Sequence, residues 1–178
     1  MLELMVGLPG GLACASGGRD LDNYLLPIAR RLGARRLDAV FGRRGHGRIF
    51  GDRVSPGQPD CCLAGSAAVV GAVTGSSESR AWKQQIHDAC RAAVRDPLPP
   101  GSVALRICFG VSSRRNWSNL WKPAIDALGP VLGIQDLRKP FRPDDDRITD
   151  IALHRGIDDM PNHDVLVDVW WSGIATAS

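Results

Sequence analysis

The sequence contains no apolar run long enough to cross a membrane, since a spanning helix needs about 18 or more apolar residues in succession. Its first residues also lack the positively charged segment and following apolar stretch of a secretory signal. We therefore expect a cytoplasmic protein with no membrane partner. The composition, 44% apolar and 23% charged, excludes collagen-like repeats and argues against disorder.

Cysteine is scarce and follows no recognised pattern. The five cysteines form no CxxC pair and no Cys/His cluster with metal-ligand spacing. Cys61 and Cys62 are adjacent, which rarely suits an ordinary disulfide, and Cys90 and Cys108 fall in apolar segments. The expectation for all five, Cys14 included, is reduced thiols.

Lysine is also rare, because 19 of the 22 basic residues are arginine. The net charge of +3 lies entirely in residues 1–61, where nine arginines accompany six acidic residues, while residues 62–178 balance to zero. Arginine favours bidentate contacts with phosphate. The charge is therefore compatible with nucleic-acid binding but does not establish it.

The hydrophobic pattern of the 178 residues predicts an α/β fold, in one domain or two small units. Residues 62–178 show the order strand, helix, strand, helix, strand, strand, and residues 1–61 add a strand, a helix and a strand that are too few to fold alone. The last two strands are expected to pair as a hairpin. The predicted strands are 2–8, 37–42, 67–73, 103–109, 146–154 and 164–171, and the predicted helices are 20–32, 78–95 and 119–132. The first helix groups its larger apolar residues on one side: Tyr24, Leu25, Ile28 and Leu32.

An internal repeat links the two parts of the chain. Residues 18–33 align with residues 114–129 at an offset of 96 positions, with five identities in sixteen. Each copy follows a predicted strand and opens a helix, with Asn near the helix start, Pro one turn later and Gly at the end. This shared context favours a duplication over a chance similarity of two strand–loop–helix units.

Two acidic clusters precede elements of the predicted fold. Asp20 and Asp22 stand at a strand-to-helix junction, where a pair of carboxylates suits Mg²⁺. Capping of the helix by one of them is the competing interpretation. Asp144, Asp145 and Asp146 precede a predicted strand, and three adjacent acids repel one another unless they are solvated or bind a cation.

A basic, glycine-rich segment follows the second predicted strand. Arg43, Arg44, His46 and Arg48 are interspersed with glycines, which suits contacts with the phosphates of a nucleic-acid backbone. An exposed turn whose charges keep a hairpin soluble is the alternative. Three arginines in the two repeated segments complete the predicted nucleic-acid contacts: Arg19, Arg114 and Arg115.

The second copy of the repeat belongs to a longer frame of motifs. A strand is followed by a run from Asn116 to Lys122 that opens a helix, then by Asp126-Ala127-Leu128, and then by the acids at 144–146 before another strand. In this frame, residues 62–178 resemble the RusA family of Holliday-junction endonucleases, whose signature is D-x-D-N-x-x-K, D-A-L and D-D. The resemblance implies a RusA-like mixed sheet with two or three packed helices. It also implies Mg²⁺-dependent cleavage of branched DNA in recombination and repair.

The chain departs from this signature in a complementary way. The two metal-binding aspartates of the family's first motif fall on Asn116 and Ser118, whereas the matching Lys122 is retained. In the amino-terminal copy, residues 19–23 read RDLDN and match the family's run, but Leu26 stands where the lysine belongs. Each copy therefore keeps what the other has lost.

Two hypotheses follow. In the first, the two units pack as an internal pseudo-dimer in place of the family's homodimer, and one composite site holds Mg²⁺ on Asp20, Asp22, Asp144 and Asp145, with Lys122 supporting the attacking water or the developing charge. In the second, the protein is catalytically degenerate and acts in binding or assembly. The sequence leaves this choice open, because the composite site requires loops far apart in the chain to meet.

Overall fold

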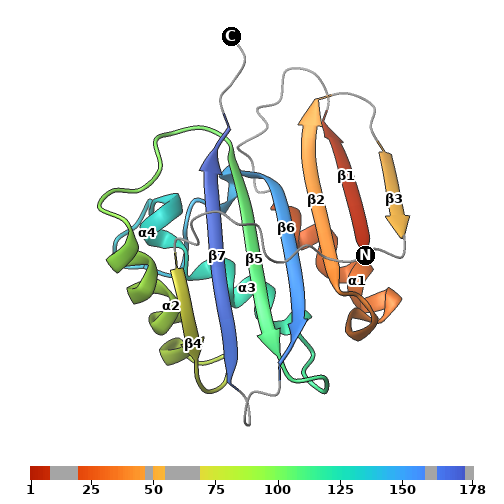
Figure 1. Ribbon diagram of the computed structural model, residues 1–178. Coiled ribbons are helices and arrows are strands. Elements are labelled where there is room, and N and C mark those ends of the chain that lie inside the picture. The colour runs from red at the N-terminus through yellow and green to blue at the C-terminus, as the bar shows by residue number, and fades with distance from the viewer. Residues whose placement is uncertain (9–19, 47–49, 55–68, 159–163, 175–178) are drawn as a thin grey trace.

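One mixed sheet runs through both parts of the chain (Figure 1). The computed structural model describes residues 1–8, 20–46, 50–54, 69–158 and 164–174. Its strands are β1 (Leu2–Leu8), β2 (Ala39–His46), β3 (Phe50–Val54), β4 (Val69–Val73), β5 (Val103–Val111), β6 (Ile148–Ile157) and β7 (Val165–Gly173). They form a seven-stranded sheet in the order β3-β1-β2-β6-β5-β7-β4. The helices are α1 (Leu21–Leu32), α2 (Arg80–Ala93), α3 (Ser118–Asp126) and α4 (Gly129–Leu132), with 3-10 turns η1 (Ala34–Arg36) and η2 (Asp145–Arg147).

The α/β class and the mixed sheet are thus as predicted, and the helices described here lie on one face of the sheet, behind it in Figure 1. The core fills the space between helices and sheet. Leu25 of α1, Trp82 of α2, Trp121 of α3 and Phe109 of β5 are all fully buried there. The Trp117 and Trp121 rings meet edge to face with 4.9 Å between their centroids, an arrangement that adds to the stabilisation from burial.

The two parts of the chain join where β2 pairs with β6. The pairing is antiparallel and runs from Ala39 opposite His154 to Arg43 opposite Asp150. On one side of this junction, β1 pairs parallel with β2 and antiparallel with β3. On the other side, β5 pairs parallel with β6 and antiparallel with β7. Residues before position 62 therefore complete this chain's own sheet, and β1–α1–β2–β3 has the same connections as β5–α3–β6–β7.

The antiparallel junction also sets the directions of the helices. Because each helix returns the chain to a parallel neighbouring strand, α1 and α3 run in opposite directions on the same face. Contacts at both ends of the pair agree with this arrangement. Lys122 of α3 lies beside Asp22 at the start of α1, and the Trp117 indole before α3 donates a hydrogen bond to the Ala34 carbonyl oxygen just after α1.

Two predicted strand pairings are wrong. The strands predicted at 146–154 and 164–171 do not pair with each other, because β6 and β7 lie on opposite sides of β5. The glycine-rich segment is not a hairpin either, since β2 continues to His46 and β3 pairs with β1. Alternating hydrophobicity identifies a strand but not its neighbour. Here a crossover through α1 places β2 on one side of β1, and β3 pairs on the other side. In the same way, a crossover through α3 places β6 on one side of β5, and β7 pairs on the other.

The helix predicted at 119–132 is interrupted, so the described chain has four helices rather than two or three. The first part, α3, ends at Asp126, and α4 begins at Gly129. Pro130 in the first turn of α4 has no N–H with which to continue the hydrogen-bond ladder from α3. Within the described ranges, no helix combines the length and the apolar character of a membrane span.

The predicted apolar side of the first helix is also partly wrong. Helix α1 buries Leu21, Leu25 and Ala29, whereas Tyr24 and Leu32 are 41% and 42% exposed. The buried residues follow the i, i+4, i+8 line that faces the sheet. Among the cysteines, Cys90 and Cys108 are buried and form no disulfide, as expected, and Cys14, Cys61 and Cys62 lie outside the described residues.

Gly42 lies where β2, β6 and α1 meet, and its replacement tests the packing of this junction. A Cβ at this position would stand 2.8 Å from Leu25 Cδ1 and 3.0 Å from Ile151 Cγ2. Since both neighbours are buried, we expect Gly42→Ala to lower the free energy of unfolding by about 1–3 kcal/mol, measured by urea denaturation. Gly45→Ala in the same strand is the control, because nothing lies within 4 Å of a Cβ there. Equal effects of the two substitutions would contradict close packing at the junction.

Candidate metal centre

Three carboxylates from distant parts of the chain meet at one end of the α1–α3 pair. One oxygen from each of Asp20, Asp22 and Asp145 lies within 4.8 Å of the others. Asp20 is the N-cap residue of α1 and Asp22 lies in its first turn, whereas Asp145 opens η2 directly before β6. The structure therefore brings together three of the four acids that the composite-site hypothesis assigned to the metal.

Helix capping does not account for the first two acids. The Asp20 side chain makes no capping hydrogen bond, and its Oδ2 instead accepts a hydrogen bond from Asn23 Nδ2 at 3.1 Å. Asp22 is only 4% exposed, and a carboxylate at that depth is costly unless charges or donors compensate it. Its burial indicates that a specific partner, rather than solvent, stabilises the charge.

Lys122 is the cation at the centre of this cluster. Its Nζ lies 2.7 Å from Asp145 Oδ2, 3.6 Å from Asp22 Oδ2 and 3.5 Å from Asp126 Oδ1. Burial alone would lower the pKa of Lys122, but the hydrogen bond to Asp145 and the charges of Asp22, Asp145 and Asp126 together raise it. Lys122 therefore remains protonated at neutral pH and acts as a fixed positive charge, not as a base.

Two participants, Asp126 and Lys83, were not predicted as site residues, although Asp126 belongs to the D-A-L motif. Asp126 contacts both Lys122 and Lys83, whose Nζ lies 2.7 Å from Asp126 Oδ2. The available signal was the i, i+4 spacing of Lys122 and Asp126, which places both on one side of a helix. Nothing in the local pattern of α2 indicated that Lys83 would join them.

The carboxylates carry more negative charge than the lysines neutralise. Burial, the charge of Asp145 and a hydrogen bond shared with Asp146 raise the pKa of Asp20 to about 6, although Lys122 acts in the opposite direction. Burial also raises the pKa of Asp22, against the effect of Lys122. Lys83 and Lys122 contact Asp22, Asp126 and Asp145, while Asp20 and the adjoining Asp146 add further acidic groups. When ionised, the carboxylates therefore outnumber the two cations, and a divalent cation would reduce the excess of negative charge.

The spacing of the oxygens also fits a divalent ion. Mg²⁺ binds oxygen at about 2.1 Å, so opposite ligands stand about 4 Å apart, and around Ca²⁺ the separation is about 5 Å. Oxygens within 4.8 Å of one another need only small side-chain movements to share one ion. Carboxylate oxygens are the donors that these hard cations prefer. Asp20, Asp22 and Asp145 could therefore hold a divalent cation, and Mg²⁺ is one that their chemistry fits.

Asp144 does not belong to this group, so its predicted place among the ligands is not supported. It lines a separate hollow of about 400 Å³ together with Arg147, whose charge opposes the rise that burial causes in the pKa of Asp144. Asp146, not Asp144, adjoins Asp20 through the shared hydrogen bond. Asp144 precedes η2 with a backbone that is not helical, whereas Asp145 is the first residue of the turn, so the two side chains point in different directions.

The prediction that Arg44 contacts nucleic acid is wrong, because its guanidinium is used inside the protein. Arg44 is 3% exposed and donates hydrogen bonds to the carbonyl oxygens of Asp146 and Ile148. It therefore connects β2 to η2 and helps to hold the turn that carries Asp145.

Arg43 is exposed but points away from the carboxylates. It forms an ion pair with Asp150, with 2.8 Å between Nε and Oδ2. The neighbouring Gly42 faces Leu25 of α1, and side chains alternate along a strand, so Arg43 lies on the sheet face without helices.

The other predicted nucleic-acid contacts fall in two groups. Arg114 is exposed and Arg115 half-buried, both in the turn after β5. Arg19, Arg48 and the side chain of His46 lie outside the described part of the chain.

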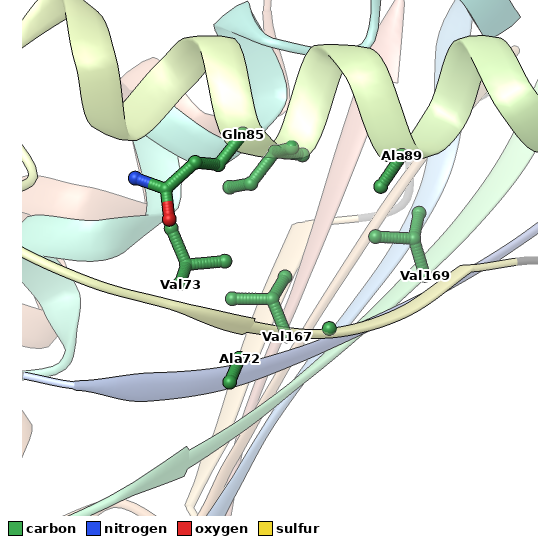
Figure 2. A pocket seen from close by; sticks show the side chains of 8 residues that line it. Ala72, Val73, Gln85, Ala89, Val167 and Val169 are labelled. Atoms are coloured by element: carbon green, nitrogen blue, oxygen red, sulfur yellow. The ribbon is translucent and has the colours of Figure 1, made fainter.

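A small apolar pocket lies between α2 and the strands β4 and β7 (Figure 2). Its volume is about 90 Å³. The polar side chain at its edge, Gln85, is already used, because its amide accepts from Thr74 N and donates to Thr74 O, both at 3.1 Å. The described lining thus offers no free polar group to orient a ligand.

No protein-family model, curated protein or solved structure compared with this chain matches it. The arrangement of its own residues is therefore the basis for a functional proposal.

Asp20→Asn tests the electrostatic imbalance. The raised pKa of Asp20 means that the folded protein holds this proton more tightly than the unfolded chain does. Ionisation of Asp20 therefore lowers the free energy of unfolding, with no effect below about pH 4 and the full effect above about pH 6. A two-unit shift corresponds to about 3 kcal/mol, and solvent screening of a partly exposed carboxylate reduces this to about 1 kcal/mol. We expect the variant to exceed the wild type by about 1 kcal/mol in free energy of unfolding at pH 7 with a chelator present. The gain should vanish near pH 4, and a gain independent of pH would contradict the imbalance.

Binding of a divalent ion is tested by its effect on thermal stability. Mg²⁺ or Mn²⁺ should raise the melting temperature of the wild-type protein, because an ion that binds only the folded state stabilises it. In Asp22→Asn and Asp145→Asn, we expect the apparent affinity to fall about 10- to 100-fold. Asp158→Asn, at an exposed acid after β6, is the control and should retain the full shift. A wild-type protein that shows no shift would exclude a metal centre.

Proposed function

We propose that this protein is a RusA-like endonuclease that cleaves branched DNA with Mg²⁺ held by Asp20, Asp22 and Asp145. The observation that carries the proposal is the meeting of these three carboxylates with Lys122. The two aspartates come from the copy of the repeat that lacks the lysine, and the lysine comes from the copy that lacks the aspartates. Complementary losses of this kind are expected when one site is shared between two units.

Each side chain has a role that its surroundings favour. Asp22 is buried and held within the first turn of α1, so it presents its oxygens from a rigid position. Asp145 accepts a hydrogen bond from Lys122, which orients its carboxylate. A bound Mg²⁺ would supply an activated water and neutralise charge on the phosphoryl group.

Lys122 acts on the charge that develops during cleavage. Its ammonium stays protonated and lies within 3.6 Å of two of the proposed ligands, so it is placed to stabilise negative charge on phosphoryl oxygens. Of the two roles considered for this lysine, stabilisation of charge is therefore the one its environment supports, since a permanently protonated amine does not deprotonate water.

The proposal includes an internal pseudo-dimer. Identical connections in β1–α1–β2–β3 and β5–α3–β6–β7 support it, as does the sequence repeat at an offset of 96 positions. A duplicated and fused unit places two equivalent helices against each other in opposite directions. One chain then contains the contacts that two subunits would otherwise make.

Cleavage of a synthetic four-way junction tests the function. We expect wild-type protein to cut a labelled junction in Mg²⁺ and not in a chelator. Asp22→Asn and Asp145→Asn should lose about 100-fold or more in rate, because each removes a ligand of the metal. Junction binding, measured separately by fluorescence anisotropy in the chelator, should persist or become tighter, since a negative charge near the phosphates is removed.

The controls separate the two hypotheses. Asp158→Asn should cut at the wild-type rate, and melting curves show whether each variant is folded. Salt-dependent binding without cleavage by the wild-type protein would favour the degenerate binding protein and overturn the proposed enzyme. Binding that is absent at every salt concentration would overturn the nucleic-acid partner altogether, because phosphate contacts require a dependence on salt.

A further inference from the structure

The internal repeat gives the metal centre a counterpart at the opposite end of the α1–α3 pair. Asp20 and Asp22 precede or open α1, and the residues 96 positions later, Asn116 and Ser118, precede or open α3. The Ser118 hydroxyl donates a hydrogen bond to Asn116 Oδ1 at 3.0 Å, so these neutral side chains satisfy each other. The counterpart therefore lacks the charges that a metal ion needs.

The turns that complete the two positions differ in charge as well. Turn η2, before β6, supplies Asp145 to the metal centre and places Asp146 beside Asp20. The corresponding turn before β2 is η1, and its sequence is Ala-Arg-Arg. Where one end of the helix pair presents two acids, the other presents Arg35 and Arg36. The duplication thus carries opposite charges at its two equivalent ends.

The arginine-bearing turn is held firmly in place. Trp117 Nε1 donates to the Ala34 carbonyl oxygen at 2.8 Å, and an Arg155 guanidinium nitrogen donates to the Arg35 carbonyl oxygen at 2.6 Å. Arg155 also pairs with Asp38, with 2.5 Å between the two atoms, so the nearest acid of this turn is already neutralised. The backbone of η1 is therefore fixed from two sides.

The side chains of this turn are available to a ligand. Arg35 and Arg36 are exposed, and neither forms an ion pair with an acid of the described chain. Arg114 is also exposed, in the turn that leads to Trp117, and Trp117 contacts η1. Two exposed guanidinium groups therefore belong to this rigid turn, and a third belongs to the neighbouring turn that Trp117 joins to it. Guanidinium groups favour bidentate contact with phosphate oxygens.

We propose that Arg35, Arg36 and Arg114 form a phosphate anchor, in which the second, metal-free end of the α1–α3 pair holds the nucleic-acid backbone while the first end cuts it. This inference rests on the proposed function. Helix α1 has 12 residues and spans about 18 Å. Phosphates along one strand of a duplex are spaced by about 3.4 Å, so the anchored phosphate lies about five nucleotides from the cut.

The test compares two triple variants that remove the same charge. Arg35→Ala, Arg36→Ala and Arg114→Ala are combined in one protein, and Arg91→Ala, Arg95→Ala and Arg142→Ala, all at exposed positions, are combined in the control. Binding of a fluorescent four-way junction is measured in a chelator over a range of salt concentrations. Each phosphate contact contributes about 0.9 to the slope of log affinity against log salt. We expect the first variant to lose about 2–3 units of slope and the control to lose less than one.

Two further measurements make the outcome specific. Replacement of the same three arginines by lysine should restore most of the slope, because charge is retained and the fold is not perturbed. A junction with a single neutral methylphosphonate about five nucleotides from the cut should bind wild-type protein more weakly than the unmodified junction does. The first variant should bind the two junctions equally. Equal slopes in the first variant and the control would overturn the anchor.

Failure of the anchor and failure of the proposed nuclease give different results. If the wild-type protein cuts the junction and the two triple variants bind alike, the anchor is wrong and the nuclease stands. If the wild-type protein does not cut but the first variant alone loses slope, the anchor stands and the nuclease is wrong.

Discussion

The antiparallel pairing of β2 with β6 is the constraint on which the rest of the molecule depends. It converts two sets of strands into one sheet and orients the second set opposite to the first. Helices α1 and α3 therefore lie antiparallel on one face, and the start of α1 meets the middle of α3. Without this pairing, Asp22 and Lys122 would belong to separate units. Gly42, at the junction, leaves the space into which Leu25 of α1 packs.

The carboxylate cluster illustrates how a fold can hold charges that repel one another. Asp22 is buried and Asp20 is half-buried, and this burial together with neighbouring acids raises the pKa of both. Lys122 offsets part of this repulsion and is itself kept protonated by it. Burial of unbalanced acids destabilises a protein, and such clusters of perturbed groups occur more often at functional sites than elsewhere.

Much of the carboxylate cluster can be predicted from the sequence, because the two repeated segments match different residues of the RusA signature. Comparison of both segments with that signature selects Asp20, Asp22, Lys122 and Asp145, which the structure places close together. The wrong predictions of site residues come from treating two adjacent residues as equivalent. Sequence patterns treat Asp144 and Asp145 alike, and Arg43 and Arg44 alike, yet neighbours in a turn or strand point in different directions. Arg44 is buried against η2, whereas Arg43 is on the other face of the sheet.

The sequence by itself determined the α/β class and most helices and strands, and it supplied the candidate carboxylates, because periodicity and donor chemistry are local properties of the chain. The tertiary structure alone decided which strands are neighbours, which acids meet, and that opposite charges occupy the two ends of the α1–α3 pair. These outcomes depend on crossover connections and on the register between β2 and β6. The contacts between β2 and β6 join residues more than a hundred positions apart, and no local pattern specifies them.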